Sequence, residues 1–128
     1  MADIGMKRQV QGTFDEVLQR IPPALEAEGF GVLTRIDVSA TLAKKLGVEF
    51  RRYEILGACN PSYAHQALTL EPGVGVLLPC NVAVWEEDGG RVTVSAVDPL
   101  QTLAAQLPAL SGIAGEVRTR LARALAAV

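Results

Sequence analysis

Residues 73–87 read GVGVLLPCNVAVWEE, and this stretch decides the fold. It is apolar from Val74 to Val84 except at the Pro-Cys-Asn step over 79–81. The run is too short to cross a membrane as a helix, because a helical span needs about 20 apolar residues. Its length is typical of a strand that is buried on both faces, or of one that changes faces at the proline. The pattern therefore predicts a central strand over residues 73–87.

The composition predicts one domain that covers all 128 residues, 1–128, and is large enough to bury a real core. Hydrophobic residues make up 49% and charged residues 20%, which is far from the composition of disordered chains. The mean hydropathy of +0.25 is high for a small soluble domain. Part of the apolar surface must then be covered by another chain, so we expect a homodimer with two-fold symmetry.

The charge balance argues against nucleic acid as a partner. The net charge is −2 and the isoelectric point is about 5.4, whereas a phosphate backbone attracts basic surfaces. The basic pairs Lys44-Lys45 and Arg51-Arg52 are typical of solvated faces. No signal peptide opens the sequence and no stretch predicts a membrane span, so we expect a soluble cytoplasmic protein with reduced thiols.

A capping box predicts the start of the first helix. Thr13 stands at the N-cap and Glu16 at the third helical position, so that each side chain can bond the backbone of the other. Apolar residues then recur at helical spacing as far as Leu25. The pair Pro22-Pro23 removes two amide donors, so we expect a kink or a restart there. Gly29 is expected to end the helix.

The rest of the chain alternates between short strands and helices, which indicates the α+β class. Besides the central strand, strands are predicted over residues 6–10, 30–38, 51–60 and 91–97. Two further helices are predicted over residues 62–70 and 109–127.

Two short helices complete the expected elements. One is capped by Ser39 or Thr41 and closed by Gly47. The other starts with Asp98 as the N-cap and Pro99 at the first helical position, and it ends before Pro108.

No strong catalytic or metal motif is present, so we predict no catalytic residue, no metal site and no cofactor. The sequence has no Walker-type loop, no HExxH motif and no CxxC pair. Its two cysteines, Cys59 and Cys80, can fill core space, line a ligand site, or form a redox or two-thiolate metal pair. His65 is the only histidine, and we expect it on a helix surface.

A Cys-Asn step occurs twice, each time at a break in an apolar run. Asn60 precedes a proline and Asn81 follows Pro79-Cys80. A buried amide must satisfy its donors and its acceptor, and an unpaired one costs about 1–3 kcal/mol. The two side chains therefore bond backbone at the strand breaks, or they face a shared pocket and bind a ligand. Asp98 is a helix cap or, alternatively, part of the same site.

Four segments, residues 28–37, 55–61, 77–82 and 97–99, together resemble the domain of unknown function 302 family. The resemblance covers essentially the whole chain. It implies an α+β fold with a single-layer, mostly antiparallel sheet packed by helices. This fold is similar to that of the TATA-box-binding protein, with the order β-α-β4-α and small extra helices. It also implies a dimer and no established activity. The likeness in fold does not imply DNA binding, because fold alone does not determine function.

Two hypotheses about function follow. In the first, the chain is a non-enzymatic dimeric domain that binds a small molecule or a protein partner. The candidate residues are Cys59, Asn60, Cys80, Asn81 and Asp98, polar groups beside an apolar core. In the second, Cys59 and Cys80 carry thiol redox or metal-handling chemistry. That alternative requires the two sulfurs to lie close together and one thiol to have a lowered pKa.

Overall fold

The structure is a computed structural model, which describes residues 4–128. In this part of the chain one antiparallel sheet has the strand order β1-β5-β4-β3-β2. The strands are β1 (Met6–Val10), β2 (Gly31–Asp37), β3 (Tyr53–Cys59), β4 (Cys80–Glu86) and β5 (Val92–Ala96). The helices are α1 (Phe14–Glu26), α2 (Val38–Leu46), α3 (Pro61–Leu70), η1 (Pro72–Leu77), α4 (Leu103–Gln106), η2 (Pro108–Leu110) and α5 (Ser111–Ala126). The predicted α+β class and the order β-α-β4-α with small extra helices are confirmed.

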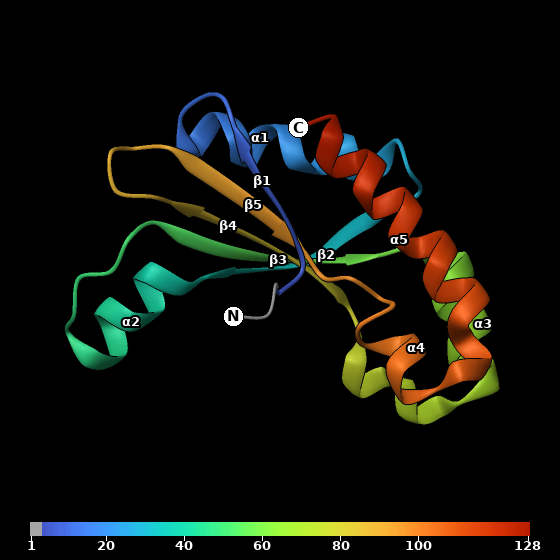
Figure 1. Cartoon of the computed structure of the whole chain (residues 1–128). Helices are drawn as coiled ribbons and strands as arrows, with labels where there is room; N and C mark the ends of the chain where they lie inside the picture. Colours follow the sequence, from blue (N-terminus) through green and yellow to red (C-terminus); the bar gives the residue numbers. More distant parts are fainter. Residues whose placement is uncertain (1–3) are drawn as a thin grey trace.

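Helices α1 and α5 lie side by side over one face of the sheet (Figure 1). The strands turn their apolar side chains toward them: Val82 and Val84 of β4 are completely buried, as are Val17 of α1 and Leu121 of α5. Full burial of one such side chain contributes about 1.5–3 kcal/mol. This layer is the main core of the protein.

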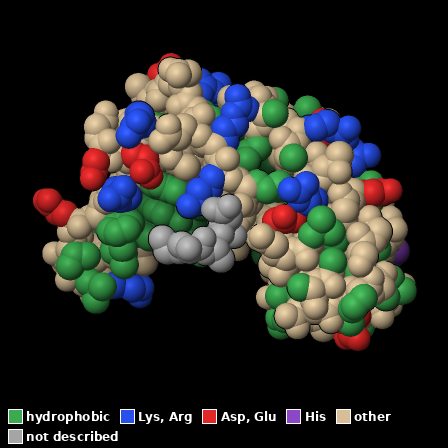
Figure 2. Space-filling view, viewed as in Figure 1, with side chains coloured by type: hydrophobic (Ala, Val, Ile, Leu, Met, Phe, Trp, Pro, Cys, Tyr) green, Lys and Arg blue, Asp and Glu red, His purple; other side chains and the backbone are tan. Residues whose placement is uncertain are grey.

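Among residues 4–128, no long helix covers the opposite face of the sheet. Instead, α2 projects beyond one end of the sheet, and α3 and α4 form a lobe at the other end (Figure 1). Between these two projections the surface is hollowed (Figure 2). The hollow measures about 420 Å³, and Tyr53, Ile55, Ala83 and Trp85 are part of its floor.

The capping box of α1 is confirmed, but the predicted restart at Pro22-Pro23 is wrong. The amide of Glu16 donates to Thr13 Oγ1 at 3.2 Å, and the amide of Thr13 donates to Glu16 Oε1 at 3.0 Å. Helix α1 continues through both prolines to Glu26. Its buried stripe extends past them, so packing on the sheet and on α5 outweighs the lost backbone donors.

The central strand is shorter than predicted, because residues 72–77 form the 3₁₀ helix η1 and not its first half. Pro72 occupies the start of this turn, and the amide of Gly73 donates to Glu71 Oε1 at 3.0 Å. Val74 is buried in a second, smaller core with Leu103 and Leu110. An apolar run alone does not distinguish a buried helix from a strand, and here the proline and glycines decide.

The cap predicted for α2 is also wrong. Asp37 is the N-cap, and its Oδ1 accepts from the amide of Ala40 at 2.9 Å and from the hydroxyl of Ser39 at 3.1 Å. Thr41 instead donates its hydroxyl to the carbonyl of Asp37 at 2.8 Å. The two residues predicted as caps thus lie within the first turn of α2 and donate hydrogen bonds to its N-cap, Asp37.

The helix predicted to start at Asp98 is shorter and starts later, as α4 (Leu103–Gln106). Asp98 Oδ1 accepts from the amide of Leu100 at 2.9 Å. This bond to the backbone two residues on forms an Asx turn and does not cap a helix. The last helix, predicted from 109, begins at Ser111 after the 3₁₀ turn η2.

Replacing Gly57 with Ala is expected to destabilise the fold. A methyl group there would lie 2.8 Å from Cγ of Pro79 and closer still to Thr34 Oγ1. Forcing extra volume into a packed site costs about 1–3 kcal/mol. Urea denaturation measures the loss.

Gly31→Ala is the matched control, because no atom lies within 4 Å of the added methyl group. It should leave the free energy of unfolding nearly unchanged. Equal stabilities of the two variants would contradict the close packing at Gly57.

Candidate functional site

Three of the five predicted site residues line one cavity of about 310 Å³: Cys59, Asn60 and Cys80. Strand β3 ends at Cys59, and β4 begins at Cys80. The two strands are antiparallel neighbours with Ala58 opposite Cys80, so the end of one strand lies beside the start of the other. The cavity therefore lies at one end of the sheet, between the sheet and the lobe formed by α3 and α4.

The rest of the cavity wall is apolar, and sequence reasoning did not predict it. Helix α3 supplies residues three and four apart, a spacing that was visible in the sequence as one helix face. The other walls come from elements far apart in the chain, which no local pattern reveals. Principal lining side chains are Phe30, Tyr63, Ala64, Leu68, Leu78 and Ile113.

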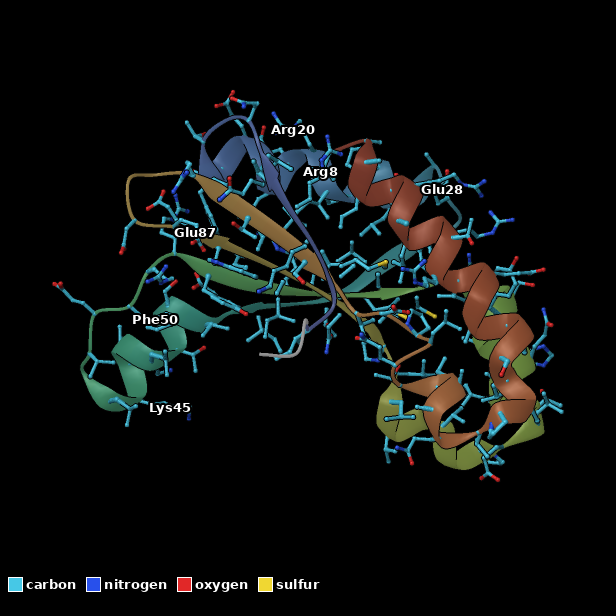
Figure 3. The ribbon with its side chains drawn as sticks, in the orientation of Figure 1. Arg8, Arg20, Glu28, Lys45, Phe50 and Glu87 are labelled. Carbon is cyan, nitrogen blue, oxygen red and sulfur yellow. The ribbon has the colours of Figure 1, made fainter. Side chains whose placement is uncertain are left out.

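Asn60 ties the cavity to the turn after α1. Its Nδ2 donates to the carbonyl of Glu28 at 3.3 Å, and Arg120 Nη1 donates to the same oxygen at 3.4 Å. The Glu28 carboxylate accepts from Arg123 Nε at 2.9 Å, beside α5 (Figure 3). Within residues 4–128, Oδ1 of Asn60 accepts no hydrogen bond from the protein.

Gly29 makes room for this arrangement. Its φ of +88° lies in the region that favours glycine, and a methyl group there would lie 3.0 Å from Nδ2 of Asn60. The glycine predicted to end the first helix thus also lets the turn approach Asn60.

Tyr63 brings a second polar group to the cavity wall. Arg120 Nε donates to its hydroxyl oxygen at 3.2 Å, and the guanidinium lies 5.6 Å from the ring centroid. The guanidinium and the ring thus form a cation–π pair that holds the phenol in place.

Both cysteines are free thiols, and Cys80 is the more buried of the two. Burial, and to a smaller extent the neighbouring Cys59, raise the pKa of the Cys80 thiol to about 11. Its thiolate fraction at neutral pH is therefore on the order of 10⁻⁴. In residues 4–128 no group of three or more histidine, cysteine or acidic side chains is positioned to hold a metal ion. His65 is exposed on α3, as predicted.

Asn81 and Asp98 lie away from this cavity, on the open face of the sheet. Asn81 is exposed, because it follows Cys80 by one residue and successive side chains of a strand point to opposite faces. Asp98 is buried, and its Oδ2 accepts from Arg118 Nε of α5 at 3.0 Å. The five predicted residues thus divide between two places, and the two asparagines do not share a pocket.

An open five-stranded antiparallel sheet with two long helices on one face defines the class of protein, a small α+β domain. The model of one family, described as "Domain of unknown function DUF302", matches residues 6–128. The chain belongs to this DUF302 family, which confirms the resemblance seen in the sequence.

One solved structure has the same fold, and a further relative is similar in sequence. A crystal structure of an uncharacterized conserved DUF302 protein from Bacillus stearothermophilus has a TM-score of 0.88 and 33% identity, with 97% of each chain covered. An uncharacterized protein of Aquifex aeolicus is 27% identical over 93 residues, 72% of this chain and 58% of that protein.

The fluoride-specific ion channel FluC 1 of Brucella suis is 27% identical over 84 residues, 66% of this chain and 33% of the channel. The chain thus spans about a third of the length of the curated Brucella relatives that it matches. In residues 4–128 of this chain, no helix is both long and apolar enough to cross a membrane.

Asp98→Ala is expected to lower the free energy of unfolding by about 1–3 kcal/mol, because it leaves the amide of Leu100 and the guanidinium of Arg118 without their acceptor. The control is Asp15→Ala. Asp15 pairs with Arg52 at 2.7 Å on the surface, where an ion pair contributes about 0–1 kcal/mol. Denaturant titration of both variants should show the larger loss at Asp98, and equal losses would contradict a structural role for that carboxylate.

The buried thiol predicts a pH dependence of stability. The pKa of Cys80 is raised in the folded protein. The contribution of this thiol to the free energy of unfolding is therefore complete below pH 9 and is lost as the pH rises through about 11. Over this window the unfolded chain ionises while the folded protein keeps the proton. The free energy of unfolding should fall by up to about 1.4 kcal/mol per pH unit from this group.

Cys80→Ala separates this effect from that of the other groups that titrate at alkaline pH. Its unfolding free energy, measured at each pH, should fall less steeply than that of the wild type above pH 9. Parallel curves for the two proteins would show that the Cys80 pKa is not raised by folding.

Proposed function

We propose that this chain is a non-enzymatic domain that binds a small, largely apolar molecule in the cavity between β3, β4 and α3. One observation carries the proposal: a cavity of about 310 Å³ is lined by apolar side chains and by a few polar groups, Asn60, Tyr63 and two thiols. Ligand pockets of proteins have this composition and begin at about 300 Å³. Asn81 and Asp98 are not part of this binding site.

The wall of the cavity indicates the chemistry of the ligand. It contains no carboxylate and no ammonium or guanidinium group, so a charged molecule would lose its hydration without gaining a partner. The Asn60 Oδ1 can accept one hydrogen bond from a hydroxyl or amide of the ligand. A neutral molecule with an apolar body and one such donor fits best.

The thiol hypothesis remains the second candidate, because Cys59 and Cys80 line the same cavity. A redox or metal-handling reaction needs a thiolate. Burial raises the pKa of Cys80, so this thiol is a poor starting point at neutral pH. The chemistry would have to begin at Cys59.

Filling the cavity is the direct test of the first candidate. Ala64→Leu adds three carbon atoms to the half-buried side chain of α3 that lines the cavity. It should weaken saturable binding of the neutral dye Nile red by roughly tenfold or more, which fluorescence titration measures. Ala126→Leu makes the same change at an exposed site of α5 and should bind the dye as the wild type does.

Unchanged dye binding by Ala64→Leu would overturn the cavity as the site. The double variant Cys59→Ser/Cys80→Ser distinguishes the two candidates, because apolar binding should survive the loss of both thiols. Intact-mass measurement of protein purified without reductant adds an independent readout. A mass about 2 Da lower per chain would indicate a disulfide and favour the thiol hypothesis.

A further inference from the structure

The segment from β2 to β3 exposes an unusual amount of apolar surface. Helix α2 buries none of its residues. Its last residue, Leu46, is 68% exposed, and Phe50 in the following loop is 48% exposed. Ile36 and Val48 are exposed as well. Phe50 and Lys45 both lie on this segment, which projects beyond the end of the sheet (Figure 3). We call residues 36–50 the arm.

The arm is continuous with the open face of the sheet. The ring of Phe50 lies 6.2 Å from that of Tyr53, and Tyr53 stacks on Trp85 at 5.5 Å with an angle of 8°. In the sheet register, Ile36 lies opposite Ile55, and Ile55 lies opposite Ala83. The arm and this row of side chains form one apolar surface, which we call the arm–sheet surface.

The total exposed area is large for a chain of this mass. A monomeric globular protein of 13.6 kDa exposes about 6,600 Å². This chain exposes 7423 Å². The difference, roughly 800 Å², matches the area that each partner buries in an interface of standard size.

The chemistry of the arm–sheet surface suits a protein interface. Its centre holds two aromatic rings and aliphatic side chains, and Lys7 is the one charged residue among the described side chains that line the hollow, apart from the ion-paired Asp98. Aromatic enrichment with few charges is the signature of an interface core. Charges of both signs stand at its edges, with Lys45 on α2 and Glu87 at the β4–β5 hairpin (Figure 3).

From these observations we infer that the arm–sheet surface is the interface between two copies of this chain. A two-fold contact brings the same patch of both copies together. Helix α2 of the arm, which buries none of its own residues, then packs on the sheet face of the partner. The basic end of α2 and the acidic hairpin supply the opposite charges that a self-complementary contact requires.

Sedimentation velocity tests the inference with the full chain. The wild type at about 100 µM should sediment as a species of twice 13.6 kDa. Leu46→Glu/Phe50→Glu places two charges in the interface and should weaken self-association at least roughly 100-fold, which leaves a monomer. Neither side chain is part of the buried core, since Leu46 is 68% and Phe50 48% exposed, so the far-ultraviolet circular dichroism should not change.

Leu70→Glu/Val76→Glu is the matched control. These side chains are 62% and 88% exposed on α3 and η1, outside the arm–sheet surface, and this variant should remain dimeric. The single tryptophan, Trp85, adds a local readout. Its emission should shift to longer wavelength when the wild type is diluted, and it should already have the monomer value in Leu46→Glu/Phe50→Glu.

Three results would overturn the inference. The first is a monomeric wild type at high concentration, which would leave the surface to a different partner. The second is a dimer that survives Leu46→Glu/Phe50→Glu. The third is dissociation of the control variant alone, which would place the interface on the α3 lobe. None of these results bears on dye binding in the cavity, so the proposed function is tested separately.

Discussion

The fold depends on the burial of the centre of β4. Val82 and Val84 are fully buried between neighbouring strands and beneath the layer of α1 and α5. Because side chains alternate along a strand, the register that buries them turns Asn81, Ala83 and Trp85 to the face without long helices. The core and the open apolar face are two results of a single register. A shift of one residue would exchange them.

The elements predicted correctly are those whose signals are local. The capping box at Thr13 and the apolar stripe of the last helix are complete within a few turns of sequence, and both are confirmed. The errors arose where tertiary packing outweighed a local rule. Helix α1 continues through Pro22-Pro23 because its stripe is buried on both sides of them. The apolar residues 73–77 bend into η1 because Val74 belongs to a second core that the sequence does not reveal.

The same limit applies to the candidate site. Cys59, Asn60 and Cys80 meet because antiparallel pairing brings the end of β3 to the start of β4, and repeated motifs at strand breaks could be predicted to do so. Asn81 differs from Cys80 by one position, which is enough to place it on the other face. The walls from α4 and α5 come from the last quarter of the chain, and only the three-dimensional arrangement reveals them.

One feature of α3 bears on how a molecule could enter the cavity. This helix forms one wall, yet among its ten residues only Ala67 is buried, whereas α1 buries six. The free energy of local opening rises with the number of buried apolar contacts, so α3 separates from the body at a lower cost than α1. Local opening of α3 would therefore widen the cavity and leave the sheet intact. The cavity wall formed by α3 and the main core beneath α1 and α5 thus belong to different parts of the chain.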